Sequence, residues 1–246
     1  CSSALSQLSG PVLLGVIGTD HDYGFWVGVG LLVLAPLALL GRSGAPSAES
    51  FSVTFADLWR FCLSLPAIAW AVALFAAFEA MILTLLPVYC LQQGFTAEIA
   101  LAMVSTVVVG DALLQLPIGA LADYLPRRTL FLSCALLLLA SSLAVPLLMH
   151  TLLIWPLWVL FGASAGGLFT LSLILIGERY RDDALVRANA HIAQLWGIGC
   201  LIGPLVAGAG SQWISGHALP LLMAAGALGL VLLLLRQGAF GAAQPV

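Results

Sequence analysis

Hydrophobic residues fall in long runs along this chain, and short polar breaks separate the runs. A bilayer core of about 30 Å is crossed by about 20 helical residues, and the runs have about that length. The pattern therefore predicts an all-α polytopic membrane protein with eight transmembrane helices. The predicted spans lie near residues 3–18, 24–41, 61–90, 98–121, 129–149, 152–177, 188–209 and 217–235.

Composition agrees with this pattern and excludes several classes of protein. Of the 246 residues, 62% are hydrophobic and only 8% are charged, whereas about 25% of residues are charged in a soluble domain. A water-exposed enzyme is therefore excluded. The net charge of −3 provides no basic patch for nucleic acid. The cysteines stand singly, with no histidine at ligand spacing, so we expect no metal site, cofactor or disulfide framework: Cys1, Cys62, Cys90, Cys134 and Cys200.

The start of the chain is unlike that of a complete protein. It opens with Cys1, and an apolar stretch is under way by Ala4 without an initiating Met or the basic segment of a signal peptide. We therefore expect the sequence to be the C-terminal part of a longer protein.

Arginine placement predicts the orientation in the membrane. All eight basic residues are arginines, and all of them fall on one side if the first span starts inside. The predicted loops on the other side, 19–23, 91–97, 150–151 and 210–216, contain none. Because Lys and Arg concentrate in short cytoplasmic loops, we expect a multi-pass protein of the bacterial inner membrane with a cytoplasmic C-terminus and a short tail at 237–246.

The longest polar stretch, residues 42–60, begins as a Gly/Pro/Ser-rich linker. Apolar residues then recur at a helical spacing that is typical of an amphipathic interfacial helix leading into the third span. A simple tether between two helical bundles remains an alternative interpretation. The spaced residues are Phe51, Phe55, Leu58, Trp59 and Cys62.

A repeated pattern links the first and seventh predicted spans. The sequence GPxxxG occurs in both, 193 positions apart, and the same offset carries span 24–41 onto span 217–234. Glycines at this spacing let two helices approach closely, and proline permits a bend. The predicted packing residues are Gly10, Pro11, Gly15, Gly199, Gly203, Pro204 and Gly208.

The loop after the fourth span resembles the loop motif of the major facilitator superfamily, G-x-L-A-D-R-x-G-R-[KR]. The chain departs from that motif at Tyr124, where the family favours Arg, and at Pro126, where it favours Gly. The matching residues are Gly119, Leu121, Ala122, Asp123, Arg127 and Arg128.

The resemblance, which is strongest to an uncharacterised bacterial branch, implies a transporter of twelve helices in two six-helix bundles that works by alternating access. Residues 1–41 would then be the last two helices of the N-terminal bundle, 42–60 the central cytoplasmic linker, and 61–236 the C-terminal bundle.

The charged end of the fourth span is a candidate conformational gate. A carboxylate at Asp123 could face the N-terminus of the helix expected near Ala188 and pair with Arg127 or Arg187. Gly119, Arg128 and Glu178 belong to the same candidate network. The alternative is that the arginines only fix topology and that Asp123 is a solvated loop acid.

Two acids lie inside predicted spans, Glu79 and Asp111. An acid in the bilayer costs about 2.5 kcal/mol or more on insertion scales, so we expect both to face a cavity on a substrate or proton pathway. Gln115 is one turn from Asp111, and His191 and Gln194 are further candidates. A structural acid that only sets helix packing, and a histidine that only bridges helices, remain alternatives.

These observations predict a secondary active transporter for a small solute, with proton-coupled efflux as a candidate mode. No basic residue lies within the spans, so a cationic or neutral solute is expected rather than an anion. The other expected partners are the lipid bilayer and protons, and the chain is expected to act as a monomer. The alternative function is a non-transporting membrane scaffold or receptor. The GxSxG sequence at 162–166 falls inside an apolar run, so we interpret it as helix packing rather than as a hydrolase nucleophile.

Overall fold

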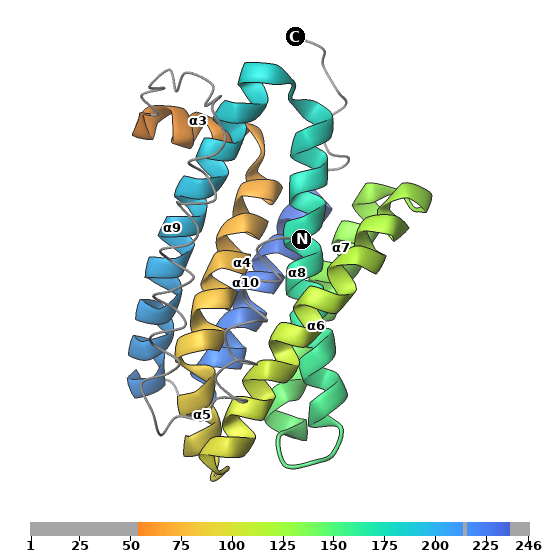
Figure 1. Ribbon diagram of the computed structural model, residues 1–246. Helices are drawn as coiled ribbons and strands as arrows, with labels where there is room; N and C mark the ends of the chain where they lie inside the picture. The colour runs from red at the N-terminus through yellow and green to blue at the C-terminus, as the bar shows by residue number, and fades with distance from the viewer. Residues whose placement is uncertain (1–53, 214–215, 237–246) are drawn as a thin grey trace, which may run out of the picture. The chain divides into compact units, whose positions relative to one another are not determined.

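The computed structural model describes residues 54–213 and 216–236. These residues form helices joined by short turns (Figure 1). The predicted spans 3–18 and 24–41 and the tail 237–246 lie outside these residues. The helices are α3 Phe55–Ser64, α4 Pro66–Thr84, α5 Leu86–Gln92, α6 Ala97–Tyr124, α7 Arg127–Leu148, α8 Ile154–Arg179, α9 Asp182–Trp213 and α10 Ala218–Arg236.

Among the described residues, six helices are long and apolar enough to cross a membrane: α4, α6, α7, α8, α9 and α10. Each coincides with one predicted apolar run from residue 61 onward. The prediction of an all-α polytopic membrane protein is thereby confirmed for the described part of the chain.

The predicted run 61–90 is divided into three helices rather than one. α3 ends at Ser64 and α4 begins at Pro66, and a second break separates α4 from α5, where Pro87 lies in the first turn. Proline has no N–H to donate and disfavours helical backbone in the residue before it, so a proline favours the end of one helix before it and suits the first turn of the next. Two prolines therefore account for both breaks.

The run predicted at 188–209 starts earlier in the structure. α9 begins at Asp182, and its first turn contains Asp182 and Asp183. Negative side chains are favoured at the positive end of the helix dipole, which extends the helix beyond its apolar part. The acids at the N-terminus of α9 are therefore its own Asp182 and Asp183. From the sequence alone, Asp123 is expected to face this N-terminus.

α8 lies at the centre of the described bundle. All eight residues from Phe161 to Leu168 are buried, and α8 contacts α4, α6, α7 and α9. The most extensive pairings are α6 with α8 and α4 with α9, and α7 packs on both α8 and α10. A stretch that is buried on all sides is expected where a helix passes through the core of a bundle.

Arginines gather at one end of the bundle. The turns from α6 to α7 and from α8 to α9 meet the end of α10 there, and α3 lies at the same end, across the direction of the long helices (Figure 1). Every arginine in the described residues belongs to this arginine-rich end: Arg60, Arg127, Arg128, Arg179, Arg181, Arg187 and Arg236.

Glycines allow the closest approach of the paired helices. A Cβ atom placed on Gly110 would collide with the carbonyl oxygen of Val159, and one on Gly162 would collide with the carbonyl of Val107. Between α4 and α9, a Cβ on Gly199 would lie 2.5 Å from the carbonyl oxygen of Ala73. Only a residue without a side chain permits this spacing between backbones.

At the remaining predicted packing positions the surroundings differ. Gly203 also lies against α4, where a Cβ would come within 2.7 Å of Ala77. At Gly208 a Cβ would meet no described atom within 4 Å, so close packing against the described residues does not require glycine there. Pro204 lies inside α9 between them. Gly10, Pro11 and Gly15 fall outside the described residues.

Replacing Gly162 by alanine is expected to destabilise the protein. The new Cβ would meet backbone atoms that cannot move without separating α6 from α8, and overpacking of this kind costs about 1–3 kcal/mol. Thermal unfolding of the detergent-solubilised protein measures the effect as a lower midpoint. Gly197→Ala on α9 is the matched control, because its Cβ would meet open space and alanine favours helix over glycine. Equal midpoints for the two variants would contradict the close α6–α8 contact.

Candidate functional site

Asp111 and Gln115 form a polar pair in the middle of α6. The Gln115 amide Nε2 donates a 2.8 Å hydrogen bond to Oδ1 of Asp111. Asp111 is 8% exposed, and Gln115 is half-buried. The structure therefore brings together the two residues that the sequence places one helical turn apart.

Gly166 of α8 makes room for this carboxylate. A Cβ on Gly166 would collide with Oδ1 of Asp111 and lie 3.2 Å from the Gln115 amide nitrogen. Asp111 therefore lies directly against the α8 backbone. Burial of a carboxylate in apolar surroundings is costly unless its charge is paired or neutralised by a proton, and Gln115 offers only a neutral hydrogen bond. The arrangement suits a group that binds and releases a proton.

Glu79 belongs to the other main helix pair. It lies on α4, is half-buried, and interacts electrostatically with Cys200 of α9. The Cys200 thiol is 3.5 Å from the carbonyl oxygen of Ala76, one turn earlier on α4. Glu79 thus lies in the helix pair α4–α9, and Asp111 lies in the pair α6–α8. Both helices of the first pair also contact α8.

Three aromatic side chains meet between α4, α8 and α9, and we call them the aromatic triad: Phe75, Phe169 and Trp196. The centroid of Phe75 is 4.9 Å from that of Phe169 and 5.4 Å from that of Trp196, and the remaining pair is 5.0 Å apart. Phe75 is buried, whereas Phe169 and Trp196 are only partly buried. The triad therefore joins three helices and leaves aromatic surface accessible.

His191 and Gln194 lie apart from the two acids. The His191 ring stacks on Phe61 of α3 at a centroid distance of 5.2 Å, and its Nδ1 atom is 3.3 Å from Oε1 of Gln194. His191 is buried among apolar residues of α3, α4 and α9 near the arginine-rich end. This pair connects α3 to the bundle.

At the arginine-rich end, Arg127 contacts two acids. Its Nη2 atom is 2.6 Å from Oε1 of Glu178 at the end of α8 and 3.7 Å from Oδ1 of Asp123 at the end of α6. The Arg127 side chain is 27% exposed and that of Glu178 is 51% exposed. Asp123, Arg127 and Glu178 therefore tie the ends of α6, α7 and α8 together, and Arg127 rather than Asp123 is the central residue.

Arg128 has a different partner from Arg127. Its Nη2 atom donates a 3.2 Å hydrogen bond to the carbonyl oxygen of Leu234, in the last turn of α10. A cation is favoured at the C-terminal end of a helix, where carbonyl groups lack helical partners. Gly119 faces Thr170 of α8, and Arg187 lies on the second turn of α9.

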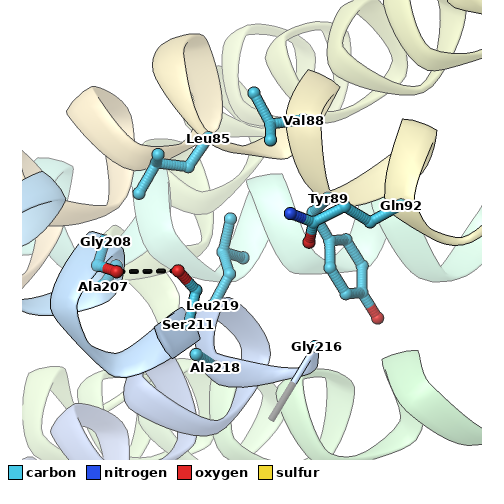
Figure 2. Close-up of a pocket in the computed structure, with 10 residues that line it drawn as sticks. All are labelled: Leu85, Val88, Tyr89, Gln92, Ala207, Gly208, Ser211, Gly216, Ala218 and Leu219. Atoms are coloured by element: carbon cyan, nitrogen blue, oxygen red, sulfur yellow. Dashed lines mark hydrogen bonds between the residues drawn. The ribbon is translucent and has the colours of Figure 1, made fainter. Parts of the chain in front are cut away.

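A small cavity lies at the opposite end of the bundle, between α5 and the ends of α9 and α10 (Figure 2). Its volume is about 40 Å³, enough for water but far below the 300–1,000 Å³ typical of ligand sites. Gly208 and Ser211 line it, and the Ser211 hydroxyl donates to the Gly208 carbonyl at 2.7 Å. Beside it, Tyr89 and His217 are joined by a 2.9 Å hydrogen bond. This cavity is too small to hold a solute.

The GxSxG sequence at 162–166 lies inside α8. The Ser164 hydroxyl donates to the carbonyl of Phe161 within α8, and Gly162 and Gly166 face α6, as the packing interpretation of the GxSxG sequence predicts. Among the described residues, no group of three or more His, Cys, Asp or Glu side chains could hold a metal ion.

Sequence reasoning missed the aromatic triad and the role of Gly166 beside Asp111. The triad joins residues from three helices that are far apart in the sequence, so no local spacing marks it. The GxxxG spacing identified Gly166 as a packing residue, but nothing in the sequence showed that its neighbour is a carboxylate.

No curated protein and no solved structure matches the chain. The family model of the Major Facilitator Superfamily matches residues 97–244, which are more than half of the chain and include α6 to α10. The proteins of this superfamily are transporters rather than enzymes and carry small-molecule substrates. With its apolar spanning helices and this match, the chain is a multi-pass membrane protein that belongs to the Major Facilitator Superfamily.

Proposed function

We propose that the chain is part of a secondary active transporter that moves a small solute across the bacterial inner membrane by alternating access. The match to the Major Facilitator Superfamily over residues 97–244 is the observation that carries this proposal. The six described spans would form the C-terminal bundle, and residues 1–41 would complete part of the other bundle. Rocking of two such bundles around a central site is a common design of secondary transporters.

The charge distribution supports a cytoplasmic location for the arginine-rich end. All seven arginines of the described residues lie there, and α10 ends there. Because arginine is concentrated on the cytoplasmic side of bacterial membrane proteins, this end and the C-terminus would face the cytoplasm. α3 would then lie along the cytoplasmic surface of the membrane. Its Leu58 and Phe61 pack on the bundle, and its exposed Phe55 and Trp59 would enter the interface.

We assign proton coupling to Asp111. Its carboxylate is buried against Gly166, accepts a hydrogen bond from Gln115, and lies on a spanning helix. A buried acid of this kind is costly in its charged form and is a standard feature of proton-coupled transport. Export driven by proton entry is the direction that we propose.

We assign the conformational gate to Asp123, Arg127 and Glu178. Their contacts hold the cytoplasmic ends of α6, α7 and α8 in one arrangement, and rocking of the bundles would change these distances. Partly exposed ion pairs contribute only up to about 1 kcal/mol, which still changes a two-state population ratio about fivefold. Gly119, Arg128 and Arg187 would support the same end of the bundle.

Reversing the charges of the Arg127–Glu178 pair tests the gate. Arg127→Glu and Glu178→Arg are each expected to shift the ratio of inward-open to outward-open protein about fivefold, because each places like charges together. The double variant restores an opposite-charge pair and is expected to return the ratio toward the wild-type value. Labelling of a reporter cysteine at Ala120, in a background without the native cysteines, measures the populations. Single variants that label like the wild type would exclude this gate.

Substitution of Asp111 tests the proton coupling. In proteoliposomes containing the full-length protein, a panel of solutes identifies one that accumulates when a proton gradient is imposed. Asp111→Asn is expected to abolish this accumulation yet retain solute exchange at equilibrium, because only the titrating group is removed. Glu98→Gln, in the exposed first turn of α6, is the matched control and is expected to behave as the wild type. Gradient-driven accumulation by Asp111→Asn would exclude the assignment.

A further inference from the structure

Two members of the aromatic triad, Phe75 and Trp196, lie on the same helix pair as Glu79, α4–α9, one helical turn away from it. Phe75 and Glu79 are four residues apart on α4, and Trp196 and Cys200 are four residues apart on α9. Residues with this spacing lie one above the other on one helix face. Because Phe75 contacts Trp196 and Glu79 interacts with Cys200, the carboxylate lies about one helical turn from the aromatic rings.

Two of the three rings have accessible surface. Phe169 and Trp196 are partly buried, and their centroids are 5.0 Å apart in an edge-to-face arrangement. α8 and α9 meet at few positions, so this ring pair bridges them while both helices pack on α4. The electron-rich faces of such rings attract a cation within about 6 Å, and tryptophan does so most strongly.

The charges of the described residues around this region favour a cation. The closest arginine along α9 is Arg187, nine residues from Trp196, which corresponds to about 13 Å of helix. His191 stacks on Phe61 near α3, and His150 and His217 lie at the opposite end of the bundle beside Phe95 and Tyr89. Among the described residues, the charged groups closest to the triad are therefore carboxylates. Glu79 is four residues from Phe75 on α4, and Asp111 contacts Gly166, three residues from Phe169 on α8.

We propose that Phe75, Phe169, Trp196 and Glu79 form a binding site for a lipophilic monovalent cation carrying aromatic or bulky apolar groups. The rings would contact the apolar groups and the cation, and Glu79 would neutralise its charge. This proposal rests on the proposed transport function and names the substrate class of that transporter. It gives the two acids of the spans separate roles: Glu79 binds the solute, and Asp111 carries the proton.

A pair of probes with the same shape and opposite charge tests the site. Tetraphenylphosphonium is a lipophilic cation, and tetraphenylborate is an anion of nearly the same size. Equilibrium dialysis with the purified full-length protein measures the binding of each. Tetraphenylphosphonium is expected to bind at least about tenfold more tightly than tetraphenylborate, since a carboxylate one turn away attracts one and repels the other. Equal binding of the two probes, or stronger binding of the anion, would overturn the proposal.

Substitutions then locate the binding. Glu79→Gln keeps the side-chain shape and is expected to weaken tetraphenylphosphonium binding at least about tenfold. Trp196→Leu is expected to weaken it about twofold to thirtyfold through loss of the cation–π contact. Glu98→Gln and Trp70→Leu are the matched controls, because Glu98 is exposed at the end of α6 and Trp70 donates to the Gly226 carbonyl of α10. Controls that weaken binding as much as Glu79→Gln and Trp196→Leu would overturn the proposal.

The outcomes separate this site from the transport function. Proton-driven transport of another solute, without tetraphenylphosphonium binding, would leave the proposed function standing and exclude the cation site. Binding with the expected response to the substitutions, but without transport of any solute, would support the site and exclude the function. Size-exclusion chromatography checks that each variant is folded. If Glu79→Gln does not fold, Trp196→Leu and the comparison of the two probes on the wild type decide the question.

Discussion

The close approach of α6 and α8 is the contact on which the candidate site depends. In a bilayer, lipid tails are as apolar as leucine, so helices associate through tight backbone packing rather than through the hydrophobic effect. Gly110 and Gly162 provide that packing here. Its consequence is that Asp111 lies against Gly166, where no other residue would leave room for the carboxylate. Helix packing and the placement of a buried acid are therefore one structural feature in this bundle.

Charged residues are distributed unevenly along the described bundle. The apolar middle of the described bundle contains acids but no arginine, and the arginines lie at one end. Within that end the two consecutive arginines differ. Arg127 pairs with acids on neighbouring helices, whereas Arg128 caps the carbonyl end of α10. Substitution of Arg128 would thus disturb a helix end, and substitution of Arg127 would disturb an ion pair. Neighbouring charges of the same motif can have separate physical roles.

Much of this architecture follows from local sequence, and the rest depends on contacts between distant residues. Apolar runs of about 20 residues predicted the six described spans, and the one-turn spacing of Asp111 and Gln115 placed them on one helix face, where the structure shows a hydrogen bond between them. Pro66 and Pro87 divide the run at 61–90, but its uniform hydrophobicity concealed the breaks. The motif at 119–128 marked Arg127, yet its strongest partner, Glu178, is 51 residues away. The aromatic triad depends entirely on how three helices pack, which no periodicity encodes.

The central helix α8 offers a physical route by which proton and solute could influence each other. Gly166 of α8 contacts Asp111, and Phe169, three residues later on the same helix, belongs to the aromatic triad. If Asp111 carries the proton and the triad binds the solute, a gain or loss of charge at Asp111 would alter the contact with the α8 backbone, and a cation at the triad would alter the contact of Phe169. Both events would therefore act on one helix that is buried at eight consecutive residues. A buried helix cannot adapt locally to either event, because packed interiors resist small deformations. We therefore expect α8 to move as a unit, and a shared element of this kind is one way in which two sites can be coupled.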